Sequence, residues 1–252
     1  MASELERKEK IKNTFGKLIS NKLYKNASFE SISLYGKEKN CVVLLLNLKN
    51  FIQLTKELSP EDAVETLNEY YNIISVAINE NQGILDKFYG NSLIAHWGAL
   101  IENENDFNDA IKCAIAIRKS IADLNKKHIL KKRPFLSLGC AINYGSVIAG
   151  QIGSISQKEY TIIGNTVSLT SEIENYNNEF DTDILISEKV KNHCEKEFNF
   201  IKMPPVSLSE SKESQNLYAV LGATDEIDSP ASLTDLRKIF HQHNPRPDSI
   251  QI

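Results

Sequence analysis

The residues of this chain that could take part in chemistry lie where apolar stretches end or turn. Asn47 ends the run CVVLLLNL, and Asn91 follows Gly90 in the sequence FYGNSL. An amide in such a place commonly satisfies nearby backbone groups or completes a turn. Lys87 and Thr161 lie in strand-like segments, where a lysine extends to water and a threonine is an ordinary strand residue. Taken by type alone, these positions read as structural.

Glycines are frequent between residues 139 and 153, which raises the question of a phosphate-binding loop. Such loops need a Gly-Lys-Ser/Thr order, and that order is absent from GCAINYGSVIAGQIG. The glycines therefore predict bends in a long strand. His96 and Trp97, which continue the strand after the Gly90-Asn91 turn, predict packing and not catalysis.

Composition limits the classes to which the protein can belong. The 252 residues carry 29 basic and 33 acidic side chains, a net charge of −4, with 41% hydrophobic and 25% charged residues. These values predict a globular domain and argue against a nucleic-acid-binding protein. The longest apolar run, 41–46, is far shorter than the ~20 residues of a membrane span, and the charged start predicts no secretion signal. Four cysteines without CxxC spacing predict buried free thiols of a reducing compartment: Cys41, Cys113, Cys140 and Cys194.

Hydrophobic periodicity predicts alternating strands and helices. The apolar stretch 41–48 is typical of a central buried strand. Ser59 caps and Pro60 begins a helix with apolar residues every three or four positions, which Gly83 ends. A hairpin with its turn at Gly90-Asn91 follows. The remaining elements are expected as helices over 106–125, 165–175 and 233–240, and as strands over 135–153, 159–163, 184–187, 198–203 and 216–222.

This order of elements predicts an α+β fold of the ferredoxin-like type (βαββαβ), with helices covering one face of a mainly antiparallel sheet. Three parts are expected: an N-terminal helical arm or linker over 1–38, a domain over 39–222 and a tail over 223–252. The arm would serve in dimerisation or pack on its own domain through a stripe of four apolar residues, Ile11, Phe15, Leu18 and Ile19.

Four stretches, in this order, resemble the class III nucleotide cyclases, the family of adenylate and guanylate cyclase catalytic domains. They are LLLNLKNF from Leu44, LDKFYGNSLIAHWG from Leu85, GCAINYGSVIAGQIG from Gly139 and EYTIIGNTVSLTSEIE from Glu159. Their spacing is similar to that of the family, and the resemblance covers residues 15–221. It implies that the domain over 39–222 is a cyclase homology domain.

The resemblance also implies a chemistry. In that family the ribose 3′-oxygen attacks the α-phosphate and pyrophosphate leaves, while two metal ions stabilise the developing charge. The two metal-binding aspartates correspond to Asn47 and Asn91 in this chain. The transition-state asparagine corresponds to Ser168, and the transition-state arginine to Glu172, one helical turn further along the same face.

Two further positions keep residue types that match the family. Lys87 stands where the family carries its adenine-reading lysine, and Thr161 stands where it carries the acceptor for the adenine amino group. The phosphate end has changed, because neutral amides replace the carboxylates that Mg²⁺ favours and Glu172 adds negative charge. The substitutions predict an inactive pseudo-cyclase that serves as a dimerising regulatory or ligand-binding module in cyclic-nucleotide signalling.

Two alternatives stay open. An active but divergent adenylate cyclase, converting ATP to cyclic AMP and pyrophosphate, would bind Mg²⁺ or Mn²⁺ through other carboxylates such as Asp86 or Glu172. Strand alternation places Asp86 on the opposite face from Lys87, which argues against this use. A diguanylate-cyclase relative would share the core topology, but its acidic hairpin is replaced here by FYGNSL.

The pseudo-cyclase interpretation carries expectations about partners and location. We expect no cofactor, and either a homodimer or a heterodimer with another cyclase domain. We also expect a weakly bound adenine-type ligand, no nucleic acid and no membrane contact by the chain itself. The expected location is cytoplasmic, either alone or as the cytosolic part of a longer membrane-anchored protein.

Overall fold

The computed structural model describes residues 36–49, 51–154, 158–209, 214–226 and 229–241. The predicted helical stripe of the arm and the end of the tail lie outside these ranges. The elements, in chain order, are β1 Lys37–Lys49, α3 Phe51–Glu57, α4 Pro60–Glu80, β2 Ile84–Tyr89, β3 Ser92–Trp97, α5 Asp106–Leu130, β4 Ser137–Gly153, β5 Lys158–Ile163, α6 Asn165–Phe180, β6 Ile184–Ser187, α7 Glu188–His193, β7 Phe198–Lys202, β8 Leu217–Ala223 and α8 Leu233–His241.

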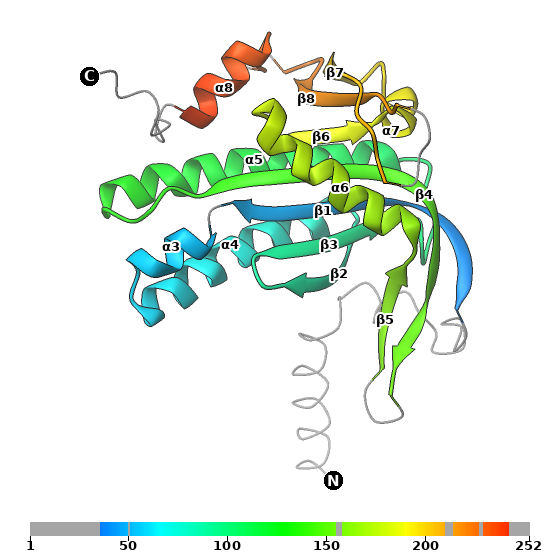
Figure 1. The fold of residues 1–252 in the computed structure, drawn as a ribbon, viewed down its shortest axis with the longest axis horizontal. Coiled ribbons are helices and arrows are strands. Elements are labelled where there is room, and N and C mark those ends of the chain that lie inside the picture. The colour runs from blue at the N-terminus through cyan, green and yellow to red at the C-terminus, as the bar shows by residue number, and fades with distance from the viewer. Residues whose placement is uncertain (1–35, 50, 155–157, 210–213, 227–228, 242–252) are drawn as a thin grey trace, which may run out of the picture.

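The described strands form one eight-stranded sheet through the middle of the molecule (Figure 1). The strand order is β2-β3-β1-β4-β6-β8-β7, and β5 pairs with the second half of β4 outside this path. Every pairing in this sheet is antiparallel except that of β4 with β6. The prediction of an α+β fold with a mainly antiparallel sheet is therefore confirmed.

Strand β1 is buried on both of its faces. Successive side chains of a strand point to opposite faces of the sheet. Val42, Leu44 and Leu46 pack into one core with residues of α4 and α5, whereas Val43 and Leu45 pack into another with residues of β4 and β5. Covering both faces requires apolar residues at every position, which explains the uninterrupted apolar run and confirms the predicted central strand.

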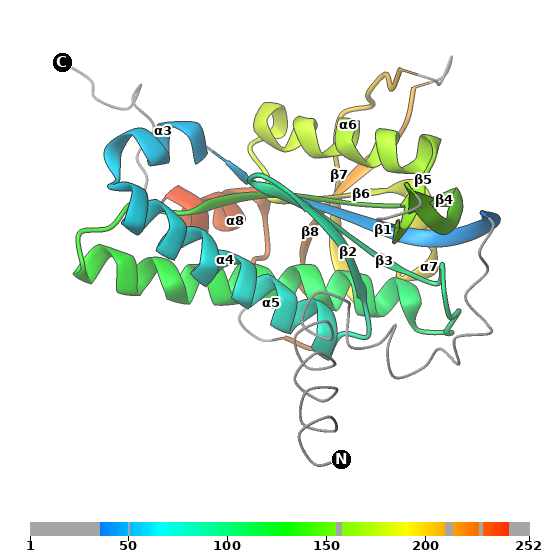
Figure 2. The same cartoon turned by 90° about the horizontal axis from the view of Figure 1, so that it is seen from below.

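Helices cover both faces of the sheet, so the expectation of helices on one face was wrong. Figure 2 shows α4 and α5 on one side of the sheet and α6 on the other. Alternation along β6 has the same consequence: Ile184 and Ile186 join the core of α4 and α5, whereas Leu185 packs with Ile173 and Phe180 of α6. Helix α6 is needed because these strands are apolar on both sides.

Local signals place α4 correctly, and the Gly83 amide closes the end of the helix by donating to the main-chain oxygen of Ile78 at 2.8 Å. The Ser59 side chain accepts a hydrogen bond from the Asp62 amide at 3.1 Å and so caps the helix. The helix ends at Glu80, before Gly83. A side chain at Gly83 would collide with the indole ring of Trp97, which is 1% exposed. Gly83 therefore allows the close approach of β2 to Trp97.

A buried ion pair joins α5 to the part of the sheet formed by β6 and β8. Arg118 donates to both carboxylate oxygens of Asp183, at 2.5 Å from Nε and 2.7 Å from Nη2. Its remaining donors reach the main-chain oxygens of Val220 and Leu221 in β8, both at 2.6 Å. One guanidinium thus joins α5, the segment before β6 and β8.

The four cysteines are free and buried, as predicted. His96 and Trp97 are each 1% exposed, which confirms that they pack in the interior. Burial lowers the pKa of His96 to about 4, so this ring is neutral at physiological pH. Within the described residues, no helix combines the length and the apolar character needed to cross a membrane.

Candidate functional site

The two asparagines at the expected metal positions lie side by side, at the end of β1 and in the β2–β3 turn. Asn91 donates from Nδ2 to Oδ1 of Asn47 at 2.6 Å and to the main-chain oxygen of Leu48 at 2.9 Å. The Ser92 hydroxyl donates to the same Asn47 oxygen at 3.0 Å. The backbone supports the arrangement, since the Leu48 amide donates to the Asn91 main-chain oxygen at 2.9 Å.

Glu174 of α6 lies behind Asn47. Its Oε2 accepts a hydrogen bond from Asn47 Nδ2 at 3.5 Å, and its Oε1 is buried without a hydrogen-bond partner. Burial raises the pKa of this carboxyl, and the charge of Lys49 and the Asn47 hydrogen bond oppose the rise. Gly139 leaves the room that the carboxylate needs, because any side chain there would collide with Oε1. Asn47 therefore uses both ends of its amide, as acceptor toward Asn91 and as donor toward Glu174.

This donor set does not fit a pair of divalent cations. Hard cations such as Mg²⁺ favour carboxylate oxygens, whereas both expected ligands here are neutral amides. The Asn47 oxygen already accepts two hydrogen bonds, and the Asn91 nitrogen already donates to Asn47 and Leu48. Among the described residues, no group of three or more His, Cys, Asp or Glu side chains could hold a metal ion.

Thr161 and Lys87, the expected adenine-reading residues, lie on β5 and β2. Thr161 is 4% exposed and donates from Oγ1 to Oδ2 of Asp86 at 3.0 Å. The Ile162 amide donates to the same oxygen at 3.3 Å. The Lys87 ammonium lies 5.8 Å from the centre of the Tyr89 ring. Thr161 thus contacts the residue next to Lys87.

The expected orientation of Asp86 rested on regular alternation, and β2 is not regular there. The pairing of β2 with β3 shifts between Leu85 and Lys87, so Asp86 lies at a bulge. Alternation does not continue through a bulge and cannot fix the face of this side chain. The carboxylate contacts β5 instead, and burial raises its pKa, opposed by Lys87 and by the two hydrogen bonds from β5.

Ser168 and Glu172 lie one turn apart on α6, as expected from their spacing. Ser168 is exposed and Glu172 is partly exposed. The Glu172 carboxylate accepts hydrogen bonds from the Ser209 amide at 2.8 Å and from the Ser209 hydroxyl. These hydrogen bonds lower the pKa of Glu172. The position expected for the transition-state arginine therefore holds a carboxylate that Ser209 already binds.

Sequence reasoning missed three supporting residues. Tyr71 of α4 donates its hydroxyl to the main-chain oxygen of Gly90, and its ring centre lies 4.3 Å from that of Phe88, so α4 holds the turn that carries Asn91. Glu174 and Ser209 are the others. Glu174 had a detectable signal, because it falls on the inward stripe of α6, which also includes Thr166, Thr170, Ile173 and Asn177. Ser209 lies in an irregular segment and had none.

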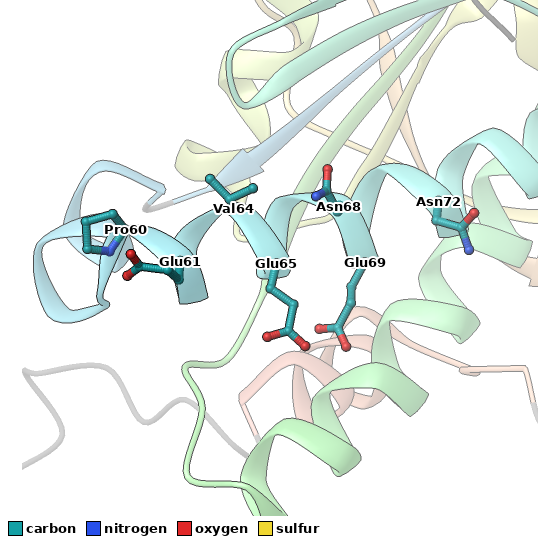
Figure 3. A pocket seen from close by; sticks show the side chains of 7 residues that line it. All are labelled: Pro60, Glu61, Val64, Glu65, Asn68, Glu69 and Asn72. Carbon is teal, nitrogen blue, oxygen red and sulfur yellow. The ribbon is translucent and has the colours of Figure 1, made fainter. Parts of the chain in front are cut away.

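Two hollows of the described surface lie away from these residues. One, of about 780 Å³, runs along α4 and is lined by Pro60, Glu61, Val64, Glu65, Asn68, Glu69 and Asn72 (Figure 3). The other, of about 260 Å³, lies between α5 and the start of β4, with Arg118 and Asp183 in its wall. None of the six candidate residues lines either hollow.

Comparison with known proteins adds the family. Residues 34–222 match the family model described as the adenylate and guanylate cyclase catalytic domain. Adenylate cyclase 1 of Rhizobium meliloti (strain 1021) is 24% identical over 189 residues, which are 74% of this chain and 28% of that protein. This chain therefore spans less than a third of that relative.

Two solved structures show the same fold. The guanylyl cyclase Cya2 has 24% identity and a TM-score of 0.72, over 79% of this chain and 100% of that chain. The dimeric guanylyl cyclase domain of the RhoGC fusion protein from the aquatic fungus Blastocladiella emersonii has 19% identity and a TM-score of 0.62, over 74% of this chain and 99% of that chain.

Proposed function

This chain belongs to the adenylate and guanylate cyclase catalytic domain family, and we propose that it is a pseudo-cyclase: a dimerising regulatory or ligand-binding module in cyclic-nucleotide signalling. The observation that carries the proposal is the hydrogen bond between Asn91 and Asn47. Two carboxylates at these positions would repel each other unless cations lay between them. Two amides satisfy each other directly and need no metal.

The transition-state end of the site supports the same interpretation. Glu172 is an anion bound by Ser209, and the exposed Ser168 offers a neutral hydroxyl. A negative charge there repels the negative charge that develops on a triphosphate in the transition state. Loss of one group that stabilises such charge commonly costs ~10²–10³ in rate. The carboxylates that an active divergent adenylate cyclase would use are already engaged, Asp86 with β5 and Glu172 with Ser209.

An assay of cyclic nucleotide production tests the proposal. The purified protein is incubated with ATP or GTP and with Mg²⁺ or Mn²⁺, and cyclic AMP and cyclic GMP are measured against a blank without enzyme. We expect no product above the blank. Formation of a homodimer should not change this result, because both symmetric sites lack the same metal-binding and transition-state groups. Clear Mn²⁺-dependent turnover that is lost in Lys87→Ala would overturn the proposal and favour the active alternative.

We propose further that an adenine-type ligand is the compound this site is best suited to bind. The Thr161 hydroxyl directs its proton at Asp86, so only its lone pairs remain for a ligand, and these accept from an amino group. Lys87 supplies a donor. Without a metal-bound phosphate anchor the affinity should be weak, because each neutral hydrogen bond contributes only ~1 kcal/mol.

Calorimetry with adenosine and ATP tests this ligand class. We expect adenosine to bind at least as well as ATP, and ATP binding to be insensitive to Mg²⁺. Tight binding of ATP that Mg²⁺ strengthens would contradict the proposal. Unchanged adenosine affinity in Lys87→Ala would show that Lys87 takes no part in recognition.

Self-association is the third part of the proposal. The β4–β5 ribbon extends away from the rest of the sheet (Figure 1) and carries three isoleucines that are 40–47% exposed, Ile148, Ile152 and Ile163. Ile148 and Ile163 are direct cross-strand partners, so their side chains share one face. Neighbouring exposed apolar groups of this kind are typical of an interaction surface.

Sedimentation measurements with matched variants test the dimer. We expect the full chain to sediment as a dimer, Ile148→Glu with Ile163→Glu to shift it toward monomer, and Val64→Glu on exposed α4 to leave it unchanged. Removal of residues 1–25 should also weaken the dimer. A stable monomer at high concentration would refute the homodimer and leave the heterodimer with another cyclase domain.

A further inference from the structure

The hollow between α5 and the start of β4 (the α5–β4 cavity) is large enough to hold a small molecule. Its volume is about 260 Å³, whereas a cavity of about 150 Å³ already binds benzene. Figure 1 shows α8 beside the C-terminal half of α5 and the start of β4, and α8 supplies part of the wall through Ile239. The apolar lining consists of Ile121, Ala122, Phe135, Leu136, Leu138 and Ile239.

Two buried side chains of the wall each keep an N–H group that lacks an acceptor among the described residues. Arg118 is 8% exposed and has five N–H groups. Its hydrogen bonds to Asp183 and to two main-chain oxygens of β8 use four of them. Asn125 is 3% exposed, and its amide nitrogen donates one of its two protons to Leu136. A buried N–H without an acceptor is costly, so the acceptor should come from the contents of the cavity that both residues line.

The more exposed polar side chains of the wall are donors as well. Ser137 is half-buried, and its hydroxyl makes no hydrogen bond within the described part of the chain. The Lys126 ammonium pairs with Asp123 at 2.7 Å on the surface. An exposed pair of this kind contributes little, so the ammonium can turn to a bound anion.

Acceptors are scarce in the same wall. Asp183 is the one carboxylate among the described residues that line the cavity, and each of its oxygens already accepts from Arg118. The charges of these two residues cancel, so Lys126 leaves the wall with one net positive charge. The cavity therefore combines an apolar lining with an excess of donors and of positive charge.

We propose that the α5–β4 cavity binds a small carboxylate with an aromatic or branched apolar body. A carboxylate only accepts hydrogen bonds, which matches a wall whose polar side chains mainly donate. Its single negative charge matches the charge of Lys126. The apolar lining from α5, α8 and the start of β4 takes up the body.

This site is independent of the proposed pseudo-cyclase function, since none of the six candidate residues lines the cavity. Its wall nevertheless holds the fold together, because Arg118 joins α5 to β8 and Ile239 belongs to α8. A ligand that binds only the folded state stabilises it by mass action. The bound carboxylate should therefore raise the thermal midpoint of the chain.

Amide NMR shifts of the ¹⁵N-labelled full chain, titrated with 3-phenylpropionate, test the site. We expect saturable shifts with a dissociation constant in roughly the millimolar range, as for a ligand of about eleven non-hydrogen atoms. The shifts should centre on residues 118–126, 135–138 and 239.

Three further probes separate the two ends of the ligand. 3-Phenylpropionamide keeps the body without the charge, and 2-phenylethylamine reverses the charge. Both should bind at least about threefold more weakly, the scale of one exposed charge interaction. Acetate, which lacks the body, should not saturate at the same concentrations.

Matched variants locate the site. Ala122→Phe fills the cavity from α5 and should abolish the shifts, whereas Lys127→Phe places the same ring on an exposed position of α5 and should keep them. Lys126→Gln should weaken 3-phenylpropionate toward the affinity of the amide and leave the amide unchanged. The wild-type shift map gives the location even if Ala122→Phe does not fold.

The proposal is overturned if 3-phenylpropionate gives no saturable shifts, or if the shifts centre on Lys87 and Thr161. It is equally overturned if 2-phenylethylamine binds as well as the carboxylate, or if a folded Ala122→Phe variant binds like the wild type. None of these results bears on cyclic nucleotide production, so a failure here and a failure of the pseudo-cyclase proposal are distinguishable.

Discussion

Asn91 donates a hydrogen bond to Asn47 at 2.6 Å, and Asn47 in turn donates to Glu174 at 3.5 Å. The direction of these bonds follows from chemistry, because a carboxylate only accepts and an amide does both. The chain of donors therefore ends on Glu174, and Asn47 is the one neutral link between the turn and a buried carboxylate.

Replacing Asn47 by aspartate should destabilise the fold by about 2 kcal/mol at neutral pH, since it removes the donor to Glu174 and sets two carboxylates against each other. The loss should shrink at low pH, where a protonated carboxyl again donates. Urea unfolding of Asn47→Asp measures it. The compensating variant, Asn47→Asp with Glu174→Gln, restores a donor and should recover most of the stability. If both variants are equally unstable, the amide–carboxylate contact is not the cause.

Asn47→Asp combined with Asn91→Asp should create a site that responds to cations. The two introduced carboxylates, together with Glu174, would form an acidic group of the kind that Mg²⁺ and Mn²⁺ favour. We expect the thermal midpoint of this double variant to rise with Mn²⁺ while that of the wild type does not. Cyclic AMP production should stay low, because Ser168 and Glu172 are unchanged.

Adding Ser168→Asn and Glu172→Arg to that double variant should give the larger gain in activity, since these groups act on the transition state. Activity of all combinations is measured with ATP and Mn²⁺. Efficient turnover by the double variant alone would show that the transition-state positions matter less than the metal positions.

Asp86→Asn should change the pH dependence of stability in one direction. Burial raises the pKa of Asp86 in the folded protein. A carboxyl whose pKa is higher when folded costs stability above that pKa and gains it as the pH falls. The wild type should therefore gain stability relative to Asp86→Asn as the pH falls from neutral toward about 3.9, the ordinary pKa of an aspartate. Unfolding free energies of the two proteins over that interval give the difference, and a difference of opposite sign would contradict the buried, charged carboxylate.

Arg118→Ala should cost about 3–5 kcal/mol, because it leaves the Asp183 carboxylate buried and unpaired. Asp183→Asn should cost less, since a neutral amide still accepts from the guanidinium and the two main-chain contacts to β8 remain. The exposed pair of Lys126 with Asp123 is the control, and Lys126→Ala should cost well under about 1 kcal/mol. Chemical unfolding of the three variants compares these losses.

Much of the fold was predictable because its signals are local. The apolar run of β1, the Ser59-Pro60 start of α4 and the Gly90-Asn91 turn depend on neighbours in sequence. The expected one-face arrangement was wrong because β4 and β6 carry apolar side chains on both faces, and the second face needs a cover of its own. Helix α6 lies on the second face for that reason.

The candidate site was predictable only by position. The resemblance to the cyclase family brought Asn47 and Asn91 together and put Ser168 and Glu172 on one helix, but the partners of these groups come from distant segments. Ser209 reaches Glu172 across 37 positions and Glu174 reaches Asn47 across 127. The bulge at Asp86 was equally hidden, because no residue type marks it.

The close contact between Gly83 and Trp97 has an optical consequence. Trp97 is the single tryptophan of the chain, so all indole fluorescence comes from one place. Its ring is buried, and Nε1 donates to the main-chain oxygen of Asn81 at 2.7 Å, just beyond the end of α4. Emission should therefore be blue-shifted and shielded from quenchers in the native protein. Any loosening of the junction between α4 and β2 should shift the emission to longer wavelength. Tryptophan fluorescence therefore reports on this end of the helix.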